Sequence, residues 1–224
     1  MDQSKLGDWL NEAVKVAAEA SQAILEIYKS DDFEVEIKGD NSPLTKADKA
    51  SHELISERLI TLTPDIPIVS EESSQLPFEV RSCWRTYWLI DPLDGTKEFI
   101  KQNGEFTVNI ALIHEHKPVL GVVYIPDKDE AYWAAEGIGA FFMGCDGVVQ
   151  SISVREADRA ALVAVDSRSH ATPQVAAYCE RLKVNEMRSI GSSLKLCLVA
   201  EGKADIYPRL GPTSEWDTAA AQCV

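Results

Sequence analysis

Strand-like runs follow one another from residue 84 to residue 154, and they constrain the fold of this 224-residue chain more than any other feature. Apolar or alternating runs separated by turn residues are typical of strands. The runs are residues 84–90, 106–113, 118–125, 130–135 and 148–154. After residue 160, predicted strands at 161–165, 186–190 and 204–208 alternate with predicted helices at 172–183 and 192–201. An antiparallel-rich first part and an alternating second part together predict an α/β (α+β) fold built as a layered sandwich.

Two helices are expected before these strands. Residues 5–29 and 47–62 place apolar side chains at three- and four-residue spacing, which is typical of amphipathic helices. Alternation in residues 33–38 indicates a half-exposed strand, and residues 66–69 form a short apolar one.

The change of pattern along the chain predicts two subdomains, residues 1–155 and residues 156–224. The last eight residues, 217–224, look like the start of a buried helix. A globular chain rarely stops at such a point, so we expect the native C-terminal end to lie beyond Val224.

Composition excludes several classes of function. The net charge is −14, which argues against nucleic-acid binding because that needs a basic face. The five cysteines form no C-x-x-C pair, so neither a disulfide framework nor a zinc site is indicated. No secretion signal and no apolar run of membrane-spanning length is visible, which predicts a cytoplasmic protein without a transmembrane segment.

The most informative motif is Asp91-Pro92-Leu93-Asp94-Gly95-Thr96, which follows the apolar run 87–90. Pro92 and Gly95 favour a sharp turn, on which the two carboxylates can converge. Carboxylates held so close repel each other, and a hard cation such as Mg²⁺ removes the repulsion. Backbone N–H groups after Gly95 and the Thr96 hydroxyl suit a phosphate group. The motif therefore predicts a site for a metal and a phosphate.

Three further acidic residues occupy similar positions. Glu71 and Glu72 come directly after an apolar run, where site residues of a sheet are expected. Asp217 stands at the start of a predicted helix. Taken alone, an acidic pair is often a solvated surface feature, and an acid at a helix start is most often an N-cap.

Taken together, these motifs resemble the inositol-monophosphatase superfamily of Mg²⁺-dependent, lithium-sensitive phosphatases. The resemblance covers essentially the whole chain and keeps the family's order of motifs. It rests on residues 44–48, 71–72, 91–96 and 216–220. Residues 91–113, 167–170 and 191–195 are most similar to the bacterial CysQ-type 3'(2'),5'-bisphosphate nucleotidases within it.

The resemblance implies an α/β/α/β/α sandwich that holds two or three Mg²⁺ ions and is inhibited by Li⁺ and Ca²⁺. The implied metal ligands are Glu71, Asp91, the Leu93 carbonyl, Asp94 and Asp217. Asp48 and Thr96 are the implied dyad that takes a proton from the attacking water, with Glu72 fixing Glu71 or that water. Asp94, Gly95 and Thr96 would hold the phosphate.

On the substrate side, the resemblance maps His170, Ser192, Lys195 and Arg209 to a nucleotide pocket. It implies removal of the 3'-phosphate from adenosine 3',5'-bisphosphate, and action on its sulfated relative, by a monomer or homodimer. The protein would be free in the cytoplasm or peripheral at the inner face of the membrane. Two alternatives stay open: a phosphatase acting on inositol monophosphate or fructose bisphosphate, and a phosphate-binding module without activity.

Overall fold

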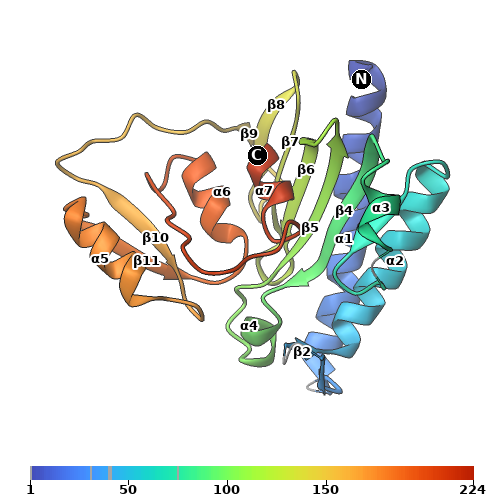
Figure 1. Cartoon of the computed structure of the whole chain (residues 1–224), viewed down its shortest axis with the longest axis horizontal. Helices are drawn as coiled ribbons and strands as arrows, with labels where there is room; N and C mark the ends of the chain where they lie inside the picture. Colours follow the sequence, from blue (N-terminus) through green and yellow to red (C-terminus); the bar gives the residue numbers. More distant parts are fainter. Residues whose placement is uncertain (1, 31, 40–41, 75) are drawn as a thin grey trace.

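The structure is a computed structural model that describes residues 2–30, 32–39, 42–74 and 76–224. Its elements stack as helix, sheet, helix, sheet and helix layers, in agreement with the predicted sandwich (Figure 1). The central layer is a seven-stranded sheet of β3 (Ile68–Ser70), β4 (Thr86–Asp94), β5 (Thr107–His114), β6 (Lys117–Ile125), β7 (Glu130–Ala135), β8 (Gly139–Met143) and β9 (Val149–Ser151), in that order. Among the described pairings of this seven-stranded sheet, β3 with β4 is the parallel one and the others are antiparallel.

Two long helices cover one face of this sheet, as the apolar spacing predicts. They are α1 (Gln3–Ser30) and α2 (Lys46–Leu62). The hydroxyl of Thr45 accepts a hydrogen bond from the N–H of Ala47, and Asp48 accepts one from the N–H of Thr45, so a capping box begins α2. Strand alternation directs Trp88 and Ile90 to these helices and Leu89 to the opposite face.

The opposite face of the sheet packs against α6 (Leu194–Ala200) and α7 (Ala219–Cys223). Gly121 on β6 makes the close approach of α7 possible, because a Cβ there would lie 2.1 Å from the carbonyl oxygen of Ala220. Although α7 belongs to the predicted second subdomain, it lies on the seven-stranded sheet. The predicted division at residue 155 stays a prediction.

The outer layers are a two-stranded parallel sheet and one helix. Strands β10 (Val163–Ser167) and β11 (Glu186–Ile190) pair in register, and α5 (Pro173–Arg181) packs against them. The remaining short elements are β1 (Glu36–Ile37), β2 (Pro43–Leu44), α3 (Phe78–Arg81), α4 (Thr96–Ile100) and a 3₁₀ turn, η1 (Pro126–Lys128).

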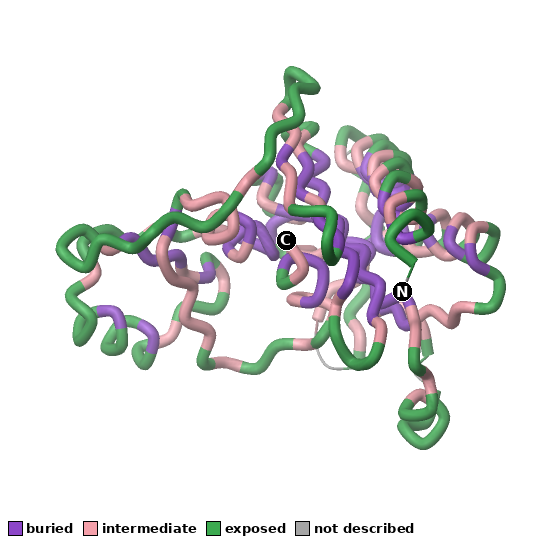
Figure 2. The backbone as a smooth tube through the Cα atoms, turned by 90° about the horizontal axis from the view of Figure 1, so that it is seen from above, coloured by how far each residue is buried: buried purple, intermediate pink, exposed green. Residues whose placement is uncertain are grey.

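Buried segments gather in the seven-stranded sheet and on the helix faces against it, whereas the connection from β9 to β10 is exposed (Figure 2). Within the described ranges, no helix is both long and apolar enough to span a bilayer. Cellular location therefore stays a prediction.

Strand prediction from the sequence failed at four places. Of the alternating run 33–38, only β1 is a strand, and both of its residues are exposed. Residues 204–208 form no strand and contribute a single bridge, from Ile206 to Ala164. Strand β8 was missed, since its sequence contains glycine and methionine rather than a clear alternation. Strand β4 does not end at Ile90 but continues to Asp94, with a register shift between Asp91 and Asp94 that accommodates the proline.

Candidate active site

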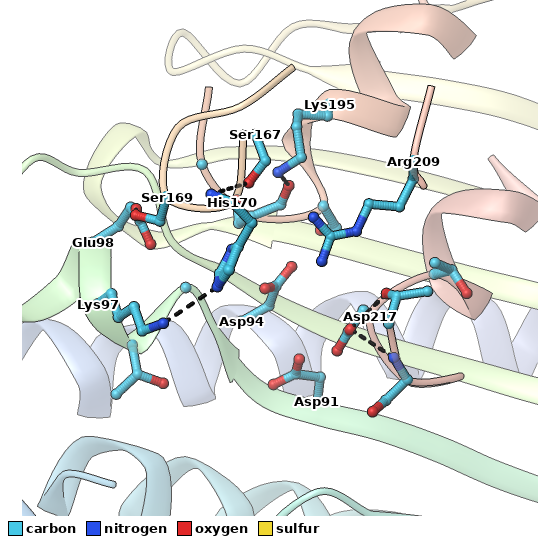
Figure 3. A pocket seen from close by; sticks show the side chains of 18 of the residues that line it. Asp91, Asp94, Lys97, Glu98, Ser167, Ser169, His170, Lys195, Arg209 and Asp217 are labelled. Carbon is cyan, nitrogen blue, oxygen red and sulfur yellow. Dashed lines mark hydrogen bonds between the residues drawn. The ribbon is translucent and has the colours of Figure 1, made fainter. Parts of the chain in front are cut away.

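A pocket of about 1040 Å³ lies between the end of β4 and the segments that follow β10 and β11. Figure 3 shows Asp91, Asp94 and Asp217 on one side of this pocket and the side chains of His170, Lys195 and Arg209 on the other. With the exceptions of Asp48 and Glu72, every predicted site residue lines it.

The parallel pairing of β3 and β4 brings Glu71 and Asp91 to the same edge of the sheet. Ser70 pairs with Ile90, and the N–H of Glu71 donates to the Ile90 carbonyl at 3.2 Å. Glu71 and Asp91 therefore come directly after a pair of residues that lie side by side on the two strands. The bulge then carries the chain to Asp94, and the turn occurs at Gly95, where φ is +94° and a side chain would be strained.

Burial and the charges of neighbouring acids raise the pKa values of two carboxyls in this pocket, Asp91 and Asp94. Burial, and then the charges of Glu71, Asp94 and Asp217, raise the pKa of Asp91 well above its ordinary value. Burial raises the pKa of Asp94 to about 7, although the ammonium of Lys195 opposes the effect. The site is therefore electrostatically unfavourable without a cation.

The acids share the pocket but do not form a closed metal shell. Among the described residues, no three carboxylate, histidine or cysteine side chains form a ready-made metal group. Instead, Glu71 and Glu72 accept hydrogen bonds from Lys38 at 2.9 and 2.5 Å. The carboxylate of Asp217 accepts from Thr213 at 2.7 Å and from the Ser214 N–H at 2.9 Å.

Hydrogen bonds from Lys38, Thr213 and Ser214 therefore orient these carboxylates in the structure. The donor chemistry still fits a hard divalent cation, since all the acidic groups present oxygen ligands. Asp91 is 1% exposed and accepts a hydrogen bond only from the Leu93 N–H among the interactions of the described side chains. Such a carboxylate is well suited to a metal ion.

The predicted proton-transfer pair is in contact. The hydroxyl of Thr96 lies 3.2 Å from Oδ1 of Asp48, and 3.4 Å from the Leu93 carbonyl oxygen. The other oxygen of Asp48 accepts from Thr45, which fixes the carboxylate on the first turn of α2. Burial raises the pKa of Asp48, while the hydrogen bonds from Thr45 oppose the rise.

The predicted substrate-side residues come from three different segments. Ser192 is 8% exposed, and its hydroxyl has no hydrogen-bond partner within the described part of the chain. Lys195 is buried and donates to the Ser192 carbonyl, and burial lowers its pKa. Arg209 donates to the Pro212 carbonyl at 2.7 Å, which aims its guanidinium into the pocket (Figure 3). The backbone N–H of His170 donates to the hydroxyl of Ser167 at 3.2 Å, which holds this residue at the pocket.

Sequence reasoning missed three residues of the pocket. Nζ of Lys97 lies 3.2 Å from Nε2 of His170. Its position directly after Thr96 in the sequence could have marked it as a residue of the site. Tyr207 faces Lys195, whose ammonium lies 5.4 Å from the ring centroid. Lys38 sits in an alternating run without any motif, so no signal in the sequence marks its contacts with Glu71 and Glu72.

Comparison with known proteins defines the class. Residues 5–224 match the inositol monophosphatase family, and the chain belongs to this family. Among its relatives is the 3'(2'),5'-bisphosphate nucleotidase CysQ of Escherichia coli (strain K12), 53% identical over 216 residues, which are 96% of this chain and 86% of that protein.

Solved structures agree with this assignment. The crystal structure of CysQ from Bacteroides thetaiotaomicron superposes with a TM-score of 0.83 at 44% identity, covering 96% of this chain and 84% of the other. The extragenic suppressor protein suhB from Bartonella henselae gives a TM-score of 0.80 at 27% identity, with 96% and 83% covered. The predicted family and fold class are thereby confirmed.

Proposed function

We propose that this chain is a Mg²⁺-dependent 3'(2'),5'-bisphosphate nucleotidase that hydrolyses adenosine 3',5'-bisphosphate to adenosine monophosphate and phosphate. Its sulfated relative would be a second substrate with the same 3'-phosphate. The observation that carries the proposal is a pocket with acidic residues on one side and cationic residues on the other. The names of the CysQ relatives support the same activity.

Glu71, Asp91, the Leu93 carbonyl, Asp94 and Asp217 would hold the Mg²⁺ ions, since they offer hard oxygen ligands around one pocket. When bound, Mg²⁺ supplies positive charge for the transferred phosphoryl group and for the water that attacks it. Burial and the neighbouring acids raise the pKa values of Asp91 and Asp94, so a bound cation would compensate carboxylates that are otherwise unfavourable.

The chain's own residues position the phosphate and move the proton. The Thr96 hydroxyl accepts the proton of the attacking water while it donates to Asp48, a relay that the 3.2 Å contact already provides. The positive φ of Gly95, +94°, makes the turn on which Asp94, Gly95 and Thr96 would hold the phosphate. Glu72, paired with Lys38, helps to fix the neighbouring Glu71.

Substrate choice would come from the cationic side. Arg209 and Lys195 can bind the 5'-phosphate, which a simple inositol monophosphate lacks. The Ser192 hydroxyl, which has no hydrogen-bond partner among the described residues, and the ring of His170 would contact the nucleoside between the two phosphates. Lys97 adds a further positive charge at the same side.

The test is Mg²⁺-dependent phosphate release from adenosine 3',5'-bisphosphate, inositol 1-phosphate and fructose 1,6-bisphosphate at equal concentrations. We expect the highest kcat/KM with the nucleotide. A preference for either sugar phosphate would assign the same fold to a sugar phosphatase instead. No turnover of any substrate, with phosphate binding retained, would make the chain a binding module.

Arg209→Ala gives a sharper test of the second-phosphate site. Losing a charged hydrogen bond should raise KM for adenosine 3',5'-bisphosphate about tenfold or more. KM for adenosine 3'-monophosphate should change much less, because that substrate has no 5'-phosphate. Equal effects on both substrates would remove Arg209 from this role.

A further inference from the structure

Glu105 connects the two sides of the pocket, although the sequence alone assigns it no role. It lies between α4 and β5, on the side of the acidic residues. Its carboxylate accepts two hydrogen bonds from the guanidinium of Arg168, both at 2.6 Å, and one from the Gly191 N–H at 2.7 Å. A single side chain therefore binds the loop after β10 and the loop after β11.

Both partners are next to residues of the cationic side. Arg168 precedes His170 by two residues, and Gly191 directly precedes Ser192. Arg168 also donates to the Ser189 carbonyl at 2.7 Å, which ties the loop after β10 to the end of β11. The Glu105 side chain is only 18% exposed, so solvent weakens these charge-assisted bonds less than it does at an open surface.

The backbones at this junction are also in close contact. A Cβ at Gly191 would lie 2.7 Å from the Glu105 carbonyl oxygen and 2.8 Å from Cγ of Glu98. A Cβ at Gly95 would lie 3.0 Å from the same carbonyl oxygen. The Glu105 backbone thus fits between the phosphate-side turn and the Ser192 loop, and no spare space separates them.

A second contact supports the same junction. The hydroxyl of Ser169 donates to the buried carboxylate of Glu98 and accepts from Lys101 at 3.2 Å. Arg168 and Ser169 come directly before His170, so the loop after β10 is anchored at the two residues that lead to the histidine.

We propose that Glu105 is a positioning residue that sets substrate specificity, by fixing His170 and Ser192 at the distance from the Asp91–Thr96 turn that a bisphosphorylated nucleoside requires. This inference rests on the proposed function. Without Glu105, the phosphate side keeps its own geometry, because none of its predicted ligands touches that carboxylate. The variant should then hydrolyse small phosphate monoesters at the normal rate, while its affinity for the nucleotide falls.

The experiment compares Glu105→Ala, Arg168→Ala and the double variant in the full chain. Substrates are adenosine 3',5'-bisphosphate and 4-nitrophenyl phosphate. We expect each single variant to raise KM for the nucleotide about tenfold, with kcat and the kinetics for 4-nitrophenyl phosphate within twofold of wild type. The double variant should raise KM for the nucleotide no further than either single variant. Glu105 and Arg168 belong to one contact, which each single substitution already removes.

The chain offers a matched control at Asp205. This carboxylate also accepts two hydrogen bonds from one guanidinium, that of Arg155, and one from a backbone N–H, that of Val163, all at 2.7 Å. Asp205 does not line the pocket. Asp205→Ala should therefore leave both KM values unchanged, whatever it does to stability.

The outcomes separate the inference from the function on which it rests. A wild-type chain without preference for the nucleotide would overturn the proposed function and, with it, the inference. A wild-type preference that survives Glu105→Ala would overturn the inference alone. Equal losses on both substrates, or the same KM change in Asp205→Ala, would show a general structural effect and would also overturn it.

Discussion

Asp94→Asn should stabilise the metal-free protein while it abolishes the phosphatase activity. The wild-type carboxyl has a pKa of about 7 instead of 3.8, chiefly because it is buried near other acids. A group whose pKa is raised by folding costs no stability below its ordinary pKa. It reduces the free energy of unfolding progressively as the pH rises through the folded-state value.

The size of the effect follows from that difference. One pKa unit corresponds to about 1.4 kcal/mol, so the three units between the two values set an upper limit of about 4 kcal/mol above pH 7. The value of about 7 already includes the attraction of Lys195. Burying the polar amide of the asparagine has a cost of its own, which reduces the gain. We therefore expect the variant to be more stable by about 2 kcal/mol at pH 8 and nearly equal to wild type at pH 4.

Urea unfolding followed by circular dichroism in the presence of EDTA measures this difference at several pH values. In the same titrations with saturating Mg²⁺, the wild-type protein should be more stable than the variant, because the ion stabilises the wild-type protein and binds the variant weakly. Asp8→Asn, on the exposed surface of α1, is the control and should not respond in this way.

A stability gain that is the same at pH 4 and pH 8 would refute the electrostatic reasoning. It would show that the substituted asparagine packs better rather than that the wild-type carboxylate is repelled. Retained Mg²⁺-dependent turnover would separately refute the role of Asp94 as a metal ligand.

Two further predictions concern packing. Phe99→Ala should lower the free energy of unfolding by about 3–5 kcal/mol in urea titrations, since Phe99 is fully buried with three aromatic rings centred 4.9–5.2 Å away; a loss under about 1 kcal/mol would contradict this. Gly121→Ala should displace α7, because the new Cβ would lie 2.1 Å from the Ala220 carbonyl oxygen. Since Asp217 lies just before that helix, calorimetry should show weaker Mg²⁺ binding, and unchanged affinity would disprove the coupling.

Much of the fold could be predicted because its elements bury one face at a regular spacing. Helices α1 and α2 follow from apolar positions on one side of each, and β5, β6 and β7 from continuous or alternating apolar runs. Prediction failed where long-range pairing decides the conformation. The extension of β4 past its proline depends on Asn109 and Thr107 of the neighbouring strand, which no local pattern reveals.

The candidate site divides in the same way. Residues on one compact motif, such as Asp91, Asp94 and Thr96, were recognisable because their chemistry is unusual at that spacing. Lys38 and Glu105 were not, since each acts through partners more than 30 residues away in the sequence. A charged side chain in an ordinary segment carries no local sign of its distant partner.

The late position of Asp217 has a consequence for protein synthesis. It is translated 126 residues after Asp91, which at ordinary elongation rates is a delay on the order of 6–25 s. During that time the strands of the seven-stranded sheet are all synthesised, but Asp217, the last acidic residue of the pocket, is not yet part of the nascent chain. Catalysis by the proposed site therefore starts only when synthesis has passed this aspartate.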